Sequence, residues 1–152
     1  MSQYEDLIKD LGSILDIPLH ADAKDTCRIE FEEGNIAIQI DLDDSGERLL
    51  IGSILGELPA GSYRNQVFEL ALRVNYLANS PRGTLAYSDI SSSLILFEFL
   101  PIATTVAQKL HDFVLLFVTH AKAWIDAIKA QSVPRLESDT QAQSSGMFGM
   151  SS

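Results

Sequence analysis

Few residues of this 152-residue chain have the type and spacing that catalysis or metal binding requires. The histidines are His20, His111 and His120, and the last two lie nine residues apart in a segment with helical periodicity. At about 100° per residue, that separation places the two side chains on opposite faces of a helix, so they cannot share a metal ion there. His20 lies in a polar segment near Asp22 and Asp25, where we expect solvated side chains.

The single cysteine, Cys27, alternates with charged residues at the start of a predicted strand. We therefore expect its side chain to face the core. A nucleophilic thiol needs a base beside it, and the sequence places no histidine next to Cys27. One cysteine cannot form an internal disulfide, which fits a reducing cytoplasm.

The run Asp41–Gly46 resembles the opening of a calcium-binding loop, with oxygen-bearing side chains at its first, third and fifth positions and glycine at its sixth. The twelfth position should supply a bidentate carboxylate, but it is Gly52. The flanking residues also have the pattern of strands, so we interpret this run as a hairpin turn. The glycines lack the spacing of a phosphate-binding loop or a dinucleotide fingerprint. We therefore predict no catalytic residue, no metal and no cofactor.

Charge and composition narrow the possible partners. The chain has 11 basic and 21 acidic residues, a net charge of -10, and 46% apolar residues, which is typical of a globular protein. Nucleic-acid binding needs a basic surface, so both nucleic acid and an anionic membrane are disfavoured as partners. We see no secretory signal and no run of roughly 18 apolar residues that could span a membrane. We expect a cytoplasmic protein with a basic or neutral partner.

The hydrophobic pattern predicts one α+β domain over residues 1–132, ordered helix, three strands, helix, two strands, helix. Ser2 and Glu5 form a capping box at the start of the first helix. Short turns between the strands imply an antiparallel sheet with helices packed on it. The expected helices run from 2 to before Pro18, from 62 to about 77, and from about 103 to 131; the expected strands are 27–32, 36–42, 49–55, 84–88 and 94–100. The polar residues 133–152 are expected to form a disordered tail.

The middle helix has more apolar surface than one core contact explains. One stripe contains Val67 and Leu70, and a second, rotated by about 100°, contains Phe68, Leu72 and Tyr76. A surface helix usually has a single apolar stripe facing the core. Strand 49–55 is apolar on both sides, so we expect it to be central; its two sides are covered if a helix packs on each. The excess apolar surface points to a symmetric partner.

The order of these motifs resembles the class I type III secretion chaperones, the family of the Tir chaperone CesT, and is most similar to its chlamydial members. The resemblance covers about residues 4–128. The residues that carry it are Leu7, Leu11, Ile38-Gln39-Ile40, Gly56-Glu57-Leu58-Pro59, Phe68, Leu72, Gly83-Thr84-Leu85-Ala86-Tyr87, Leu94–Phe99, His120, Ala121 and Trp124.

The resemblance implies a cytoplasmic bacterial homodimer that binds the extended, non-globular N-terminal region of secreted effectors. It would keep that region competent for secretion, prevent its aggregation and use no cofactor. Components of the secretion apparatus are further implied partners. The implied dimer interface contains Phe68, Leu72, Tyr76, Leu85 and Tyr87.

Candidate cargo-binding residues are apolar positions in the first helix and the first two strands. They are Leu7, Ile8, Leu11, Ile29, Phe31, Ile36 and Ile38. A core role is the alternative for each of them. Two other functions stay open: an adaptor or sensory domain of the same α+β fold that binds a folded partner, and a small-molecule enzyme or binding module, which the scattered polar residues disfavour.

Overall fold

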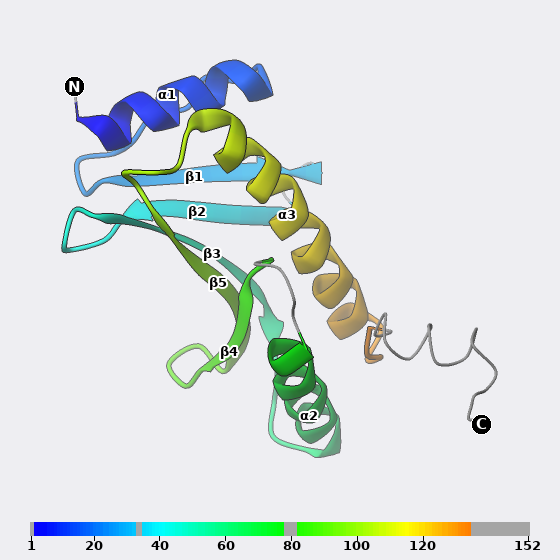
Figure 1. Cartoon of the computed structure of the whole chain (residues 1–152). Coiled ribbons are helices and arrows are strands. Elements are labelled where there is room, and N and C mark those ends of the chain that lie inside the picture. Colours follow the sequence, from blue (N-terminus) through cyan, green and yellow to red (C-terminus); the bar gives the residue numbers. More distant parts are fainter. Residues whose placement is uncertain (1, 33–34, 78–81, 135–152) are drawn as a thin grey trace, which may run out of the picture.

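The helices and strands follow one another in the predicted order. The structure is a computed structural model that describes residues 2–32, 35–77 and 82–134. Its elements are α1 (Gln3–Leu15), β1 (Thr26–Phe31), β2 (Ile36–Leu42), β3 (Arg48–Glu57), α2 (Ser62–Leu77), β4 (Thr84–Ser88), β5 (Ser93–Pro101) and α3 (Ala107–Lys129) (Figure 1). This confirms the predicted α+β class.

The five strands form one antiparallel sheet in the order β1-β2-β3-β5-β4. The predicted hairpin at 41–46 is present: the Asp43 N–H donates to the Arg48 carbonyl at 3.0 Å, and Gly46 has a φ of 74°. Strand β3 pairs with β2 on one side and β5 on the other, so its central position is confirmed. A bulge between Ile54 and Gly56 shifts the register of β3 against β5.

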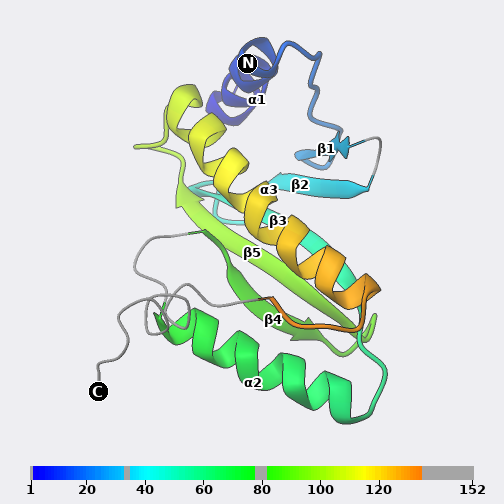
Figure 2. The same ribbon diagram turned by 90° about the vertical axis from the view of Figure 1, so that its right-hand side faces the viewer.

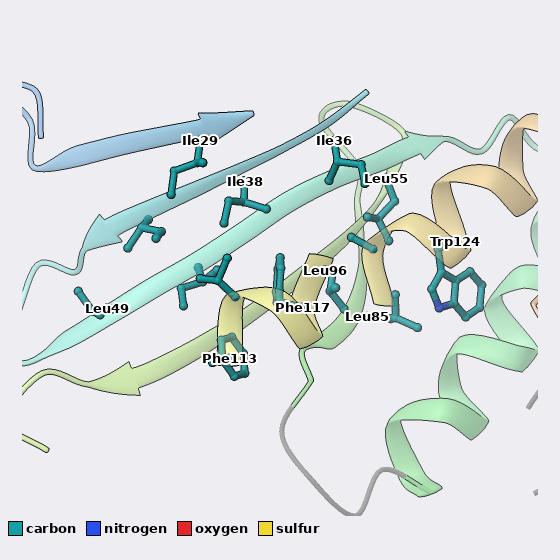
Figure 3. Close-up of a cluster of buried hydrophobic side chains, with 14 of the residues drawn as sticks. Ile29, Ile36, Ile38, Leu49, Leu55, Leu85, Leu96, Phe113, Phe117 and Trp124 are labelled. Atoms are coloured by element: carbon teal, nitrogen blue, oxygen red, sulfur yellow. The ribbon is translucent and has the colours of Figure 1, made fainter. Parts of the chain in front are cut away.

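One face of the sheet forms the core with the helices. Alternate residues of each strand share a face, and the pairs Ile29–Ile38, Ile40–Ile51 and Ser53–Leu96 lie directly opposite one another. Helix α3 crosses this face diagonally (Figures 1 and 2). Its aromatic side chains Phe113, Phe117 and Trp124 lie against the sheet residues (Figure 3), and all the members of this cluster are at most 8% exposed.

The two shorter helices are fixed by polar contacts as well as by packing. Helix α1 begins at the predicted capping box, with the Glu5 N–H donating to the Ser2 hydroxyl at 3.1 Å. The buried Tyr4 hydroxyl donates to the Ile40 carbonyl at 2.7 Å and ties α1 to β2. Helix α2 lies beyond the other end of the sheet, next to β4 (Figure 2).

One expected boundary needs correction. Helix α3 begins at Ala107 instead of 103, because residues 102–104 form a turn and the Thr105 hydroxyl donates to the Pro101 carbonyl at 2.6 Å. Helix α1 ends before Pro18 as predicted, at Leu15, and Asp16 adopts a left-handed conformation. Within the described residues the helices pack on one face of the sheet, so β3 has a helix layer on one side.

The predicted tail 133–152 lies outside the described residues except for Val133 and Pro134. In the parts of the chain that are described, no helix is both long enough and apolar enough to cross a membrane.

Candidate protein-binding surfaces

The outward side of α2 carries large apolar side chains that no other described residue covers. Val67, Leu70 and Ala71 face the core, as the first stripe predicts. Leu72 is 70% exposed and Tyr76 is 88% exposed. The second stripe found in the sequence is therefore a solvent-exposed surface in the single chain, which we call the α2 surface.

A cluster of Arg64, Phe68 and Tyr87 joins the α2 surface to β4. The Phe68 and Tyr87 rings meet edge to face with centroids 5.0 Å apart. The Arg64 guanidinium lies 5.6 Å from the Tyr87 ring centroid, and its Nη1 donates to the Tyr87 hydroxyl at 3.2 Å. Its Nε is buried and has no acceptor among the described residues.

Asn75 links α2 to the edge strand β4 through two hydrogen bonds. Its side-chain amide donates to the Leu85 carbonyl at 2.9 Å and accepts from the Leu85 N–H at 2.9 Å. These two bonds satisfy backbone groups on the unpaired side of edge strand β4. The Leu85 side chain faces the core and is 4% exposed. Of the five predicted interface residues, Leu85 is therefore buried within its own chain, whereas the other four lie wholly or partly at the surface.

The sheet face opposite the helices is also apolar. Register places Leu50 opposite Phe99, and Ile54 opposite Ile95, with Phe97 on the same face. Ile54 is 67% exposed and Phe99 is 36% exposed. We call Leu50, Ile54, Ile95, Phe97 and Phe99 the uncovered sheet face.

Aromatic and cationic contacts give the uncovered sheet face a defined shape. The Phe97 and Phe99 rings are 6.1 Å apart and nearly perpendicular. The Arg48 guanidinium lies 4.0 Å from the centroid of the Phe99 ring. The sequence analysis did not select these residues, although the run that is apolar on both sides of β3 was the available signal.

The predicted cargo-binding residues lie mostly in the core. Six of the seven are at most 7% exposed; they are Leu7, Ile8, Leu11, Ile29, Ile36 and Ile38. Figure 3 shows Ile29, Ile36 and Ile38 on the sheet face that α3 covers. Phe31, at the end of β1, is half-buried. Contact between a cargo segment and these residues stays a prediction, and for the six buried ones it requires the core to open.

Strand β1 offers a backbone edge rather than side chains. It pairs with β2, and its other side has no strand partner within the described residues. Lys122 of α3 forms an ion pair with Glu32, which lies just past the end of β1; the Lys122 Nζ is 2.7 Å from the Glu32 carboxylate. An unpaired edge of this kind can accept an additional strand.

The potential catalytic groups do not converge. His111 bonds to its neighbour Asp112 at 3.1 Å, which lowers the pKa of that carboxyl group. His120 lies 3.3 Å from the Arg82 carbonyl, and burial lowers the pKa of its ring. Cys27 faces the core as predicted, and burial raises the pKa of its thiol. Among the described residues, no three His, Cys, Asp or Glu side chains come together as a metal site would require.

The family model of the Tir chaperone protein (CesT) family matches residues 6–125. No curated protein sequence matches the chain. Among solved structures, the HopA1–SchA chaperone–effector complex has a chain with a TM-score of 0.67 and 20% identity, covering 82% of this chain and 94% of that one.

Two further solved structures have the same fold. The Yersinia pestis type III secretion chaperone SycH, in complex with a fragment of YscM2, has a TM-score of 0.63 and 16% identity, covering 78% of this chain and 97% of that one. The ExsC–ExsE complex has a TM-score of 0.65 and 13% identity, with coverages of 80% and 90%. The likeness to chlamydial members stays a prediction.

Proposed function

Since this chain belongs to the Tir chaperone protein (CesT) family, we propose that it binds the extended N-terminal segment of one or more secreted effectors. It keeps that segment unfolded, protects it from aggregation and holds it ready for type III secretion. The protein acts in the bacterial cytoplasm, catalyses no reaction and needs no cofactor. The observation that carries this proposal is the uncovered sheet face, an apolar surface that its own helices leave open.

The energetics explain why such a surface is needed. Ordering an extended segment costs about 1–2 kcal/mol per residue in backbone entropy. Burying one large apolar side chain returns about 1.5–3 kcal/mol. Cargo side chains must therefore dock at close intervals, and the aromatic pair Phe97 and Phe99 offers such docking positions. Main-chain bonds to the free edge of β1 would add to the affinity.

The α2 surface supports pairing of two copies. A two-fold interface needs one self-complementary patch, and Leu72 with Tyr76 supplies exposed apolar area on a rigid helix. Two copies joined in this way leave both uncovered sheet faces available for cargo. The shared fold with a chain of the HopA1–SchA chaperone–effector complex supports an effector as the cargo.

The test is co-purification with the first 50–100 residues, roughly, of effectors encoded in the same cell, a length suited to wrapping a large surface. Ile54→Asp places a charge on the uncovered sheet face, at its most exposed apolar residue. We expect it to weaken binding roughly tenfold or more, since an Ile contact of about 1.5–3 kcal/mol is lost. Ile90→Asp is the matched control, because Ile90 is fully exposed in the β4–β5 turn.

Two results would count against the proposal. One is that no effector segment binds. The other is that the chain binds only a folded partner domain, which would favour the adaptor function. Equal weakening by Ile54→Asp and Ile90→Asp would show that cargo binds elsewhere.

A further inference from the structure

The described part of the chain ends beside the end of β3, on the helix-covered side of the sheet. The Ile128 side chain of α3 packs on Gly56 of β3, where a Cβ atom would lie 2.9 Å from Ile128 Cγ2. The Tyr63 hydroxyl then donates to the Ser132 carbonyl at 2.7 Å. The chain therefore leaves α3 beside the end of β3, two residues from Ile54 (Figures 1 and 2).

The sequence that follows Pro134 has one large apolar residue at its start, Leu136, and its other large apolar residues after position 146. Residues 137–146 are polar or small, and Met147, Phe148 and Met150 come directly after them. A flexible linker of this length has an end-to-end distance of roughly 20 Å. A sheet with its side chains is about 10 Å thick, so the linker can pass round the end of the strands to the opposite face.

We propose that Met147–Met150 docks on the uncovered sheet face of its own chain and occupies it until another polypeptide displaces it. Methionine adapts its shape to irregular apolar surfaces and makes favourable sulfur–aromatic contacts, which Phe97 and Phe99 offer. Phe148 supplies one rigid aromatic anchor. Gly146 and Gly149 flank these residues and let the backbone approach the sheet closely.

Because Met147–Met150 is tethered to the sheet through its own chain, a weak intrinsic affinity is enough for it to bind. A short flexible linker gives the attached segment a millimolar effective concentration, so a segment of about 1 mM intrinsic affinity is bound roughly half of the time. Such an occupant shields the apolar face yet is displaced by a tighter ligand. Displacement by cargo rests on the proposed function, whereas docking of the tail does not.

Paramagnetic NMR on the full chain tests the docking directly. A spin label is attached at Ser145→Cys; Cys27 is buried and its thiol pKa is raised, so it does not compete for the reagent. The methyl signals of Ile54 and Ile95 should broaden more than those of Ile17 at the end of α1. In the matched control, the same label is combined with Met147→Ser, Phe148→Ser and Met150→Ser, and this excess broadening should disappear.

Equal broadening with and without the three serines would overturn the proposal, because a tethered chain that does not dock gives that result. A second sample mixes spin-labelled chains with chains that carry no spin label and whose methyl signals are recorded. It shows whether the docked tail belongs to the same chain as the sheet or to another copy. Broadening that arises only between chains would mean that a second copy supplies the occupant, and own-chain docking would be wrong.

Fluorescence of the dye 8-anilinonaphthalene-1-sulfonate gives an independent measure of the open face. The triple serine variant should raise the dye signal about twofold if the tail covers the face half of the time. Adding Ile54→Asp to that variant should reverse the rise, and Gln141→Ser with Gln143→Ser should leave the signal unchanged. No rise in the triple variant would contradict docking, whether or not an effector is ever found.

Discussion

Gly83 is a residue at which backbone conformation and packing both require glycine. Its φ is +111°, and a Cβ atom there would lie 2.7 Å from Leu96 and 3.1 Å from Phe117. The start of β4 therefore passes close to the core only because this position has no side chain. The same residue begins the Gly-Thr-Leu-Ala-Tyr motif that the family resemblance rests on.

We predict that Gly83→Ala destabilises the fold by about 3 kcal/mol, combining left-handed strain with overpacking. Gly46→Ala is the matched control, because Gly46 also has a positive φ (74°) but no atom lies within 4 Å of its Cβ position. It should cost only about 1–2 kcal/mol. Urea unfolding of both variants at one chain concentration measures the difference, and equal losses would show that the contact with Leu96 is unimportant.

Arg64 gives a second prediction at this scale. Arg64 holds the Phe68–Tyr87 cluster beside the α2 surface through its bond to the Tyr87 hydroxyl, so Arg64→Ala should loosen this cluster and weaken the dimer roughly tenfold, since a hydrogen bond from a charged group contributes about 1.5–3 kcal/mol. Arg28→Ala is the control, because Arg28 is exposed on β1 and pairs only with Glu30. Sedimentation velocity over a dilution series measures dissociation. An unchanged dimer in Arg64→Ala would remove this residue from the interface.

At the scale of elements, the β2–β3 hairpin depends on the ionised Asp43 carboxylate. Asp43 accepts from the Ser45 hydroxyl at 2.6 Å and from Arg48 Nε at 2.8 Å, and these bonds lower its pKa to about 2. A lowered pKa in the folded state stabilises the protein above the unfolded pKa of about 4. That contribution is lost as pH falls from about 4 through 2.

We therefore expect wild type to be more stable than Asp43→Asn at pH 6, and the two to converge near pH 2. Denaturant unfolding at several pH values measures this difference. Asp44→Asn is the control, since Asp44 is exposed in the same turn, and it should follow wild type. A stability difference between wild type and Asp43→Asn that stays constant down to pH 2 would contradict the role of the ionised carboxylate.

The elements themselves could be predicted because periods of two and of 3.6 residues record directly which side chains share a face. The same periodicity does not indicate which helix or partner packs against a given face. Leu11 and Ile38 have the same pattern whether a helix of the same chain or a cargo covers them, and the structure places both in the core. Ile54 illustrates the reverse case, because its strand is apolar on both sides and the structure leaves the side with Ile54 open. Deciding between these outcomes requires the positions of the helices.

At the scale of the molecule, all the helices lie on one side of the sheet, so a single chain has an excess of apolar surface. The α2 surface and the uncovered sheet face belong to different elements and can have different partners. If the α2 surface binds another copy of the chain and the uncovered sheet face binds cargo, different substitutions should affect dimerisation and cargo binding.

The decisive variant combines Phe68→Asp and Leu72→Asp. Phe68 packs on Tyr87 and Leu72 is open to solvent, so two carboxylates there would place charge in the centre of a dimer interface. An unpaired buried charge is strongly unfavourable, and the variant should be monomeric or aggregate. Multi-angle light scattering measures the mass of the particles.

Leu115→Asp with Leu116→Asp is the matched control, because these two leucines are exposed on α3 and should leave a dimer intact. Ile54→Asp should also remain dimeric while losing cargo, which separates the two surfaces. A clean dimer in the Phe68 and Leu72 variant would move the interface away from α2. The uncovered sheet face would then be the strongest remaining candidate for self-association, and Ile54→Asp should be the substitution that yields monomers.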